Sequence, residues 1–244
     1  MHSEDTPVSH LLISNLEALR KKLKSAHRIA VLTGAGVSAE SGIPTFRGSG
    51  GLWKQYRAKD LATPQAFARD PKLVWEWYDW RRGLIAGAQP NAGHIALAEL
   101  ESRSRNFTLI TQNVDDLHER ASSKNVLHVH GSIWKVCCLD CRRESVDMCS
   151  PLPEIPPHCE CGGLLRPGVV WFGESLPRGI WEQAETAARL ADILLVVGTS
   201  AVVYPAAGLI HYAKEVIEVN IQASGVTETC LEGPSGELLP QLIA

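Results

Sequence analysis

The chain has 244 residues, which suits one main domain with a modest insert. Its hydrophobic fraction of 45% is ordinary for a globular core, and its net charge of -3 argues against general nucleic-acid binding. No window approaches the roughly 18 apolar residues of a membrane span, and the first ten residues lack the apolar region of a signal peptide. We therefore expect no nucleic-acid or membrane partner, and a monomer in the cytoplasm. A mitochondrial protein that has lost a transit peptide is the alternative.

The first predicted elements are a helix, a strand and a glycine turn. Apolar residues at helical spacing between Leu12 and Leu23 indicate an amphipathic helix. The β-branched and aliphatic run Arg28–Thr33 predicts a buried strand. The following residues fit G-x-G-x-x-G/A, a turn that lets the backbone approach a pyrophosphate; its three small positions are Gly34, Gly36 and Ala39. Alone this pattern is weak evidence, because glycine turns between strands and helices are common.

A long loop follows the glycine turn. The segment from Glu40 to Trp53 contains two glycine clusters and a proline, which predict a long loop. A dehydrogenase would carry a second strand here, with an acidic residue for the ribose. We instead expect a loop that covers a bound dinucleotide, which disfavours a hydride-transfer enzyme.

The rest of the chain alternates between helices and strands. Thr63-Pro64, Asp70-Pro71 and Asn91 indicate the starts of three helices. A fourth helix is expected from about Pro205. Buried strands are predicted at 107–111, 126–129, 192–198 and 215–220, the last being the final strand. This alternation predicts an α/β fold with a mostly parallel, doubly wound sheet. The strands end along one ligand-binding edge, at Gly34, Gln112, His130, Gly198 and Asn220.

The cysteines interrupt this alternation. Cys138-x2-Cys141 and Cys159-x-Cys161 are two pairs at a separation typical of structural zinc, which four thiolates hold in a tetrahedron. The second pair is tighter than usual, so other nearby side chains are possible substitute ligands: Cys137, Cys149 and His158. The competing interpretation is a set of buried free thiols.

In their order along the chain these motifs resemble those of the sirtuins, the NAD-dependent protein lysine deacylases. The motifs are residues 34–47, 111–115, 130–131, the cysteine pairs, 198–200 and 219–220. The resemblance runs from about residue 12 to the C-terminus. It implies a Rossmann-like large domain over 12–244, a small zinc-binding insert over 137–165, and a helical segment over 45–90 that forms the cofactor loop and acyl pocket. It also implies NAD+ as co-substrate, structural Zn2+, and acyl-lysine proteins or peptides as substrates.

The resemblance assigns roles to individual residues. His130 is expected to act as general base toward the ribose hydroxyl, with Asn113 as the second catalytic residue. His118 and His128 are the alternatives, and we expect both to pack or cap. The expected NAD+ contacts are Gly34, Ala35, Gly36, Ser38, Phe46, Arg47, Trp53, Gln112, Asn113, Val114, Asp115, Gly198, Thr199, Ser200, Asn220, Ile221, Gln222 and Ser235.

A further motif bears on the acyl group. Tyr78 and Arg81 are three residues apart on a predicted helix, so they share a face and could bind a carboxylate. Spacing alone favours a core tyrosine and a solvated arginine. However, Tyr-x-x-Arg, with Ala58 as the small residue that widens the pocket, resembles the desuccinylase and demalonylase branch of the sirtuins. Residues 169–174 resemble the strand that pairs with the substrate backbone, and the expected contacts there are Val169, Trp171, Phe172, Gly173 and Glu174.

One departure from the family pattern and three rival functions remain. The segment between Pro205 and Asn220 is about four residues shorter than the family's usual connection, near the adenosine end of the site.

The first rival function is that of an ADP-ribosyltransferase, and the second is that of a non-catalytic binder of NAD or acyl-lysine. A plain deacetylase is the alternative within the sirtuins.

Overall fold

The computed structural model describes residues 7–45, 52–53 and 55–244, and its centre is a six-stranded parallel sheet. The strand order is β11-β10-β9-β1-β4-β5, and every neighbouring pair is parallel. The strands are β1 (Arg28–Thr33), β4 (Asn106–Thr111), β5 (Val126–His128), β9 (Ile193–Val197), β10 (Val216–Asn220) and β11 (Cys230–Glu232). The predicted parallel sheet is confirmed. The expectation that 215–220 is the last strand was wrong, because the three-residue β11 is too short to show a hydrophobic period.

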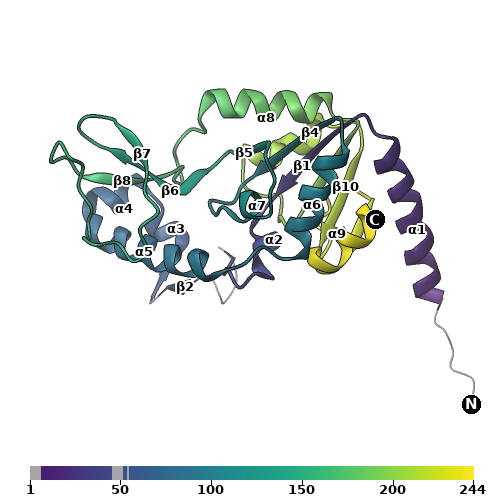
Figure 1. The fold of residues 1–244 in the computed structure, drawn as a ribbon, viewed down its shortest axis with the longest axis horizontal. Helices are drawn as coiled ribbons and strands as arrows, with labels where there is room; N and C mark the ends of the chain where they lie inside the picture. Colours follow the sequence, from purple (N-terminus) through teal and green to yellow (C-terminus); the bar gives the residue numbers. More distant parts are fainter. Residues whose placement is uncertain (1–6, 46–51, 54) are drawn as a thin grey trace, which may run out of the picture.

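Helices cover both faces of this sheet (Figure 1). On one face, α1 (Pro7–Ser25), α6 (Ala92–Arg103) and α9 (Ser235–Ile243) pack on apolar side chains that include Val31 and Leu109. On the other, α8 (Arg178–Leu190) and η2 (Ala206–Tyr212) pack on Leu32 and Ile110. Successive residues of β1 thus enter two different cores, as the two-residue period of a strand requires.

The segment expected as a helix from about Pro205 forms the 3-10 helix η2 instead. The amide of Gly208 donates to the carbonyl of Pro205 at 2.8 Å, the i to i+3 pattern. A 3-10 helix rises about 2.0 Å per residue, against about 1.5 Å for an α-helix. The seven residues of η2 therefore span a longer distance than seven residues of an α-helix would.

A second module lies beside the parallel sheet, at the left of Figure 1. Its antiparallel sheet has the order β7-β6-β8, from β6 (Gly131–Cys138), β7 (Glu144–Val146) and β8 (Leu165–Val169). The short hairpin of β2 (Leu52–Trp53) and β3 (Tyr56–Arg57) leads into α3 (Ala58–Leu61), α4 (Pro64–Arg69) and α5 (Pro71–Gly87). The helices and the antiparallel sheet of this module share one core, which is rich in aromatic rings: Phe67, Trp75, Trp77, Tyr78, Trp134 and Trp171.

The predicted helix starts are confirmed by their caps. The hydroxyl of Thr63 accepts from the amide of Ala66 at 3.0 Å, and Asp70 accepts from the amide of Leu73 at 2.9 Å. Asn91 accepts from two amides of α6. These caps set where α4, α5 and α6 begin, and so set which side chains of α5 reach the interior.

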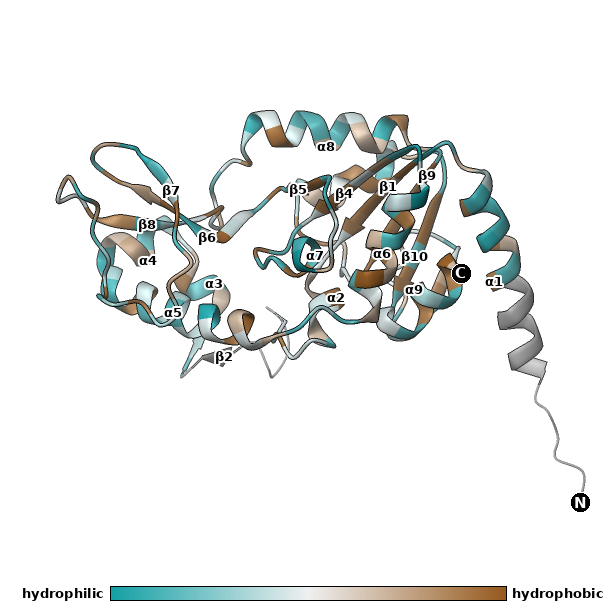
Figure 2. Cartoon of the chain, in the orientation of Figure 1, coloured by the Kyte–Doolittle hydropathy of each residue, from teal (hydrophilic) through white to brown (hydrophobic). Residues whose placement is uncertain are grey.

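The hydropathy pattern matches this layering (Figure 2): the central strands are hydrophobic, and α8 alternates between polar and apolar faces. Among the helices of the described residues, none is both long enough and apolar enough to cross a bilayer.

Candidate active site

A cavity of about 1080 Å³ lies between the carboxyl edge of the parallel sheet and the aromatic module. It brings together most of the residues that the sequence predicted. The predicted residues that line it are Gly34, Ala35, Gly36, Ala58, Tyr78, Arg81, Gln112, Asn113, Val114, His130, Val169, Trp171, Phe172, Gly173, Glu174, Gly198, Thr199, Ser200, Asn220, Ile221 and Gln222. Phe46 and Arg47 lie outside the described residues, and Trp53 is described only as part of the backbone of β2.

The glycine turn is locked against the end of β9. The amide of Gly34 donates to the carbonyl of Val197 at 3.0 Å, and the amide of Gly36 donates to that of Gly198 at 2.8 Å. Gly198 has φ +57, and a Cβ there would lie 2.4 Å from the amide nitrogen of Val37. Position 198 therefore requires glycine. The backbone at the start of α2 (Ala35–Ala39) lines the cavity and is not covered by large side chains, so a ligand can approach it.

A buried polar network supports this wall from behind. The side-chain amide of Asn113 donates to the carbonyl of Gly34 and to the hydroxyl of Ser38, both at 3.1 Å. Because both amide hydrogens are committed, Oδ1 remains as the acceptor of Asn113. Ser38 in turn donates to Asp115 at 3.0 Å.

Two residues of this network differ from the expectation of direct NAD+ contact. Ser38 and Asp115 are both buried, and neither is among the residues that line the cavity. The oxygens of Asp115 accept from Ser38 and from the amide of Leu117. Burial raises the pKa of Asp115, although these two hydrogen bonds oppose the shift. In this structure both residues orient Asn113 from behind the wall.

His130 has a defined tautomer at the cavity surface. Its Nδ1 lies 3.0 Å from the carbonyl oxygen of Gln112, which can only accept, so Nδ1 carries the hydrogen and Nε2 is the basic atom. Burial lowers the pKa of His130, and the hydrogen bond to Gln112 opposes this only in part. The ring is therefore neutral at pH 7, as a general base must be.

The two rival histidines have structural partners, as expected. His118 is buried, its Nε2 lies 3.0 Å from the hydroxyl of Thr33, and burial lowers its pKa. His128 is paired with Glu119. Neither lines the cavity.

The opposite wall is made by α5 and the end of β8. Tyr78 and Arg81 are 3% and 6% exposed, yet both line the cavity. The indole nitrogen of Trp171 donates to the hydroxyl of Tyr78 at 3.0 Å, and the guanidinium carbon of Arg81 lies 5.6 Å from the ring centre of Trp77. Burial raises the pKa of Tyr78, which therefore remains a neutral phenol with a hydrogen to donate. The interpretation of Arg81 as a solvated arginine was wrong.

The expected substrate-pairing strand at 169–174 is only partly a strand. β8 ends at Val169, and residues 172–174 form a turn with Gly173 at φ +88. The amide of Phe172 donates to the carbonyl of Ala62 at 2.9 Å. Glu174 is bound by Arg166 at 2.7 Å and accepts from the amide of Trp171. These contacts bend the chain, so Glu174 holds the turn.

The four predicted zinc ligands converge in the small module. The sulfur atoms of Cys138, Cys141, Cys159 and Cys161 all lie within 4.8 Å of one another. The distance from Cys138 to Cys161 is 3.5 Å, and that from Cys141 to Cys159 is 3.8 Å. Zn–S bonds of about 2.3 Å give a tetrahedron with edges of about 3.8 Å, so the four thiolates fit a structural zinc ion. The possible substitutes Cys137, Cys149 and His158 are not part of this cluster.

Comparison with known proteins shows which family has this arrangement. The model described as the Sir2 family matches residues 34–205. The chain belongs to the Sir2 family. The NAD-dependent protein deacylase of Aquifex aeolicus is 60% identical over 205 residues, which are 82% of this chain and 86% of that protein. The NAD-dependent protein deacylase 2 of Pyrobaculum aerophilum is 52% identical over 229 residues, covering 91% and 92%.

Solved sirtuin structures show the same fold. A Sir2 homologue in complex with NAD is 48% identical and superposes with a TM-score of 0.88, covering 93% of this chain and 92% of that one. A complex of Sir2 with a p53 peptide and NAD+ is 29% identical, with a TM-score of 0.83 and coverage of 92% and 95%. The predicted Rossmann-like sheet with a zinc-binding module is thus confirmed.

Near the carboxyl ends of β9 and β10, one residue lies elsewhere than expected. The side chain of Asn220 donates to the carbonyl of Thr199 at 2.9 Å, and that of Gln112 donates to the hydroxyl of Thr199 at 3.0 Å. Ser235, expected near the adenine, does not line the cavity. It begins α9 and donates to Glu40 at 2.7 Å, which ties α9 to the end of α2.

Several residues that line the cavity were not predicted from the sequence. Val203, Tyr204, Pro205, Ala223 and Ser224 follow β9 and β10, so the rule that ligands bind at strand ends could have found them. Thr45, Arg57, Lys59, Ala62 and Leu176 come from loops and short elements whose positions no periodicity reveals.

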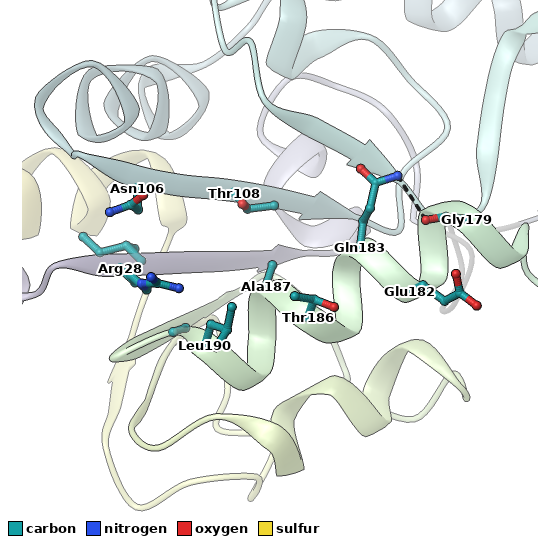
Figure 3. Close-up of a pocket in the computed structure, with 11 residues that line it drawn as sticks. Arg28, Asn106, Thr108, Gly179, Glu182, Gln183, Thr186, Ala187 and Leu190 are labelled. Carbon is teal, nitrogen blue, oxygen red and sulfur yellow. Dashed lines mark hydrogen bonds between the residues drawn. The ribbon is translucent and has the colours of Figure 1, made fainter.

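The structure also has a second hollow, of about 600 Å³, between α8 and the outer ends of β1 and β4 (Figure 3). Arg28, Asn106 and Leu190 lie on it, and Gln183 donates back to the carbonyl of Gly179 at 3.0 Å. None of the residues predicted for sirtuin chemistry lines this hollow.

Proposed function

We propose that this chain, an NAD-dependent protein deacylase, removes acidic acyl groups from protein lysines and has weaker deacetylase activity. The acyl groups are succinyl, malonyl or glutaryl, and the products are nicotinamide, free lysine and 2′-O-acyl-ADP-ribose. The observation that carries the acyl preference is the pair Tyr78 and Arg81, whose side chains are buried but line the same cavity as His130.

The sheet-edge wall supports the common chemistry. The exposed backbone of the glycine turn suits the phosphates of NAD+, and Asn113 presents a fixed acceptor to the ribose. Neutral His130, with its basic Nε2, can take the proton from a ribose hydroxyl as that oxygen attacks the activated acyl group. The structural zinc supplies no step of this reaction and holds the small module together.

The aromatic wall supports recognition of a carboxylate. A carboxylate that enters this buried region must be paired, since an unpaired buried charge costs several kcal/mol. Arg81 offers parallel N–H donors, Tyr78 offers a phenol hydrogen, and Ala58 leaves room beside them. Acetyl-lysine has no carboxylate to accept these hydrogen bonds, so its turnover should be slower.

The test is kcat/KM with NAD+ on one peptide carrying succinyl-, acetyl- or butyryl-lysine, followed by mass spectrometry. Butyryl-lysine is the control, because it has the four carbons of succinyl without the carboxylate. We expect a succinyl preference of about 10²-fold over both, or about 2.7 kcal/mol. Equal or reversed preference would make the chain a general deacetylase. Nicotinamide release without any deacylation would favour an ADP-ribosyltransferase, and no turnover a binder. The cytoplasmic location and monomeric state stay predictions.

A further inference from the structure

His128 lies at the end of β5, two residues before His130, between two hydrogen-bond acceptors. Its Nε2 is 2.5 Å from a carboxylate oxygen of Glu119, on α7 (Leu117–Arg120). Its Nδ1 is 3.3 Å from the carbonyl oxygen of Asn113. A carbonyl oxygen and an ionised carboxylate can only accept, so both ring nitrogens must carry hydrogen. His128 is therefore an imidazolium in this arrangement.

The surroundings of the ring favour this charge. The titratable groups that face it are Glu119 and His118 from α7 and Asp115 from the preceding loop, and on β4 its partner is Thr111. Burial lowers the pKa of His128, but the bond and charge of Glu119, the carbonyl of Asn113 and the charge of Asp115 together raise it above its ordinary value. The pKa of Glu119 is lowered by the same pairing, despite burial.

The carbonyl that His128 binds belongs to Asn113, whose side chain faces the cavity. The backbone amide nitrogen of Asn113 donates to the hydroxyl of Thr111 at 3.1 Å, and His128 binds the backbone carbonyl at the other end of the same residue. We propose that His128, charged and held by Glu119, is a positioning residue that fixes the backbone of Asn113 for the deacylation reaction. The kinetic test of this inference rests on the proposed function, because it measures deacylation. The role of His128 itself does not depend on which acyl group is removed.

Deprotonation of His128 should break its hydrogen bond to the carbonyl of Asn113. A neutral ring keeps one hydrogen, so it can satisfy only one of its two acceptors. The charge-assisted bond to Glu119 is the shorter and stronger one, and Nδ1 would then present a lone pair to the carbonyl of Asn113. Because the folded-state pKa is raised, the contact is complete below the ordinary value of about 6.5 and is lost as pH rises through the raised pKa.

The kinetic test compares pH profiles of kcat/KM for the wild type and three variants. We expect activity to fall about 2- to 10-fold on the alkaline side in the wild type, the worth of one ordinary hydrogen bond. His128→Asn keeps a donor near the position of Nδ1 but cannot titrate, so its profile should lose this alkaline fall. His128→Leu should be reduced by the same factor at every pH, in kcat more than in KM. Glu119→Gln can donate its amide hydrogen to Nε2 of the neutral ring, which then keeps its hydrogen on Nδ1, so the alkaline fall should disappear in this variant as well.

A direct measurement separates this inference from the proposed function. The NMR signals of the Asn113 side-chain amide should titrate together with the ring of His128, without any turnover. His211→Asn, a change at an exposed histidine on η2, is the control and should leave both the profile and these signals unchanged. Asn113 signals that ignore the titration of His128, or an alkaline fall that persists in His128→Asn, would overturn the role. Loss of turnover on every acyl peptide with the coupling intact would refute only the function.

Discussion

The two walls of the cavity are built in different ways. The wall at the edge of the parallel sheet consists of backbone and small polar groups, positioned by the ends of strands and by glycines that permit close approach. The wall formed by α3, α5 and β8 is made mainly of large side chains, whose positions depend on one another through ring contacts and the bond between Trp171 and Tyr78, with the small Ala58 beside them. The first wall suits chemistry common to every acyl group, and the second suits discrimination among them. Substitutions in one wall should therefore leave the role of the other unchanged.

Zinc removal should have the largest effect, and it should act on the aromatic wall. Cys138 ends β6, which pairs with β8, and β8 leads directly to Trp171. Structural zinc contributes on the order of 10 kcal/mol to folding in small zinc modules. We expect a chelator to abolish turnover of all acyl peptides while NAD+ binding to the large domain survives. Zinc content by mass spectrometry, peptide turnover and NAD+ titration are the measurements. Full turnover by a zinc-free protein would contradict the assignment.

His130→Ala should affect both acyl groups equally. Removal of a general base typically costs about 10²- to 10⁴-fold, and the carboxylate pocket is untouched. Kinetics on succinyl and acetyl peptides should therefore fall in parallel. In the wild type, kcat/KM should rise with pH through a His130 pKa below the ordinary value, because burial disfavours the imidazolium. That acid limb should vanish in the variant. A loss confined to one acyl group would place His130 in recognition instead.

Arg81→Met should separate the two walls. It retains the length and apolar stem but leaves an acyl carboxylate unpaired, at a cost of about 3–5 kcal/mol, or roughly 10²- to 10⁴-fold in desuccinylation. Weak deacetylation should be retained. Arg57→Met, at another arginine that lines the same cavity, is the control and should change the acyl preference little. Equal loss of both activities in Arg81→Met would refute the carboxylate pocket.

Tyr78→Phe should have the smallest effect. The ring remains in its contacts with Trp75 and Trp77, and only the hydroxyl is removed. A hydrogen bond to a charged group contributes about 1.5–3 kcal/mol, so we expect about a 10- to 100-fold fall in kcat/KM for succinyl-lysine and little change for acetyl-lysine. The melting temperature checks that the partner Trp171 tolerates the change. An equal fall for both substrates would mean that Tyr78 only holds Trp171 in place.

Much of the sheet-edge wall could be predicted from the sequence, because its signals are local. The β-branched runs, the glycine turn and the polar residues at strand ends each lie within a few consecutive residues. A parallel sheet then brings His130, Gln112 and Gly198 to one edge without further information. The four zinc ligands were equally predictable, since the spacing of two cysteine pairs reflects the geometry of one tetrahedral ion.

Only the tertiary structure decided how these residues are layered. Ser38 and Asp115 lie behind Asn113 because a contact between residues 77 positions apart orients them, and no local pattern records it. The turn after Val169 depends on a bond to Ala62, and the charge of His128 depends on Glu119 from a separate helix. The sequence by itself determined the elements, the sheet edge and the metal ligands, since these follow from short-range periodicity and spacing. Burial, tautomer and charge are set by contacts with residues on other elements of the fold, so they required the folded structure.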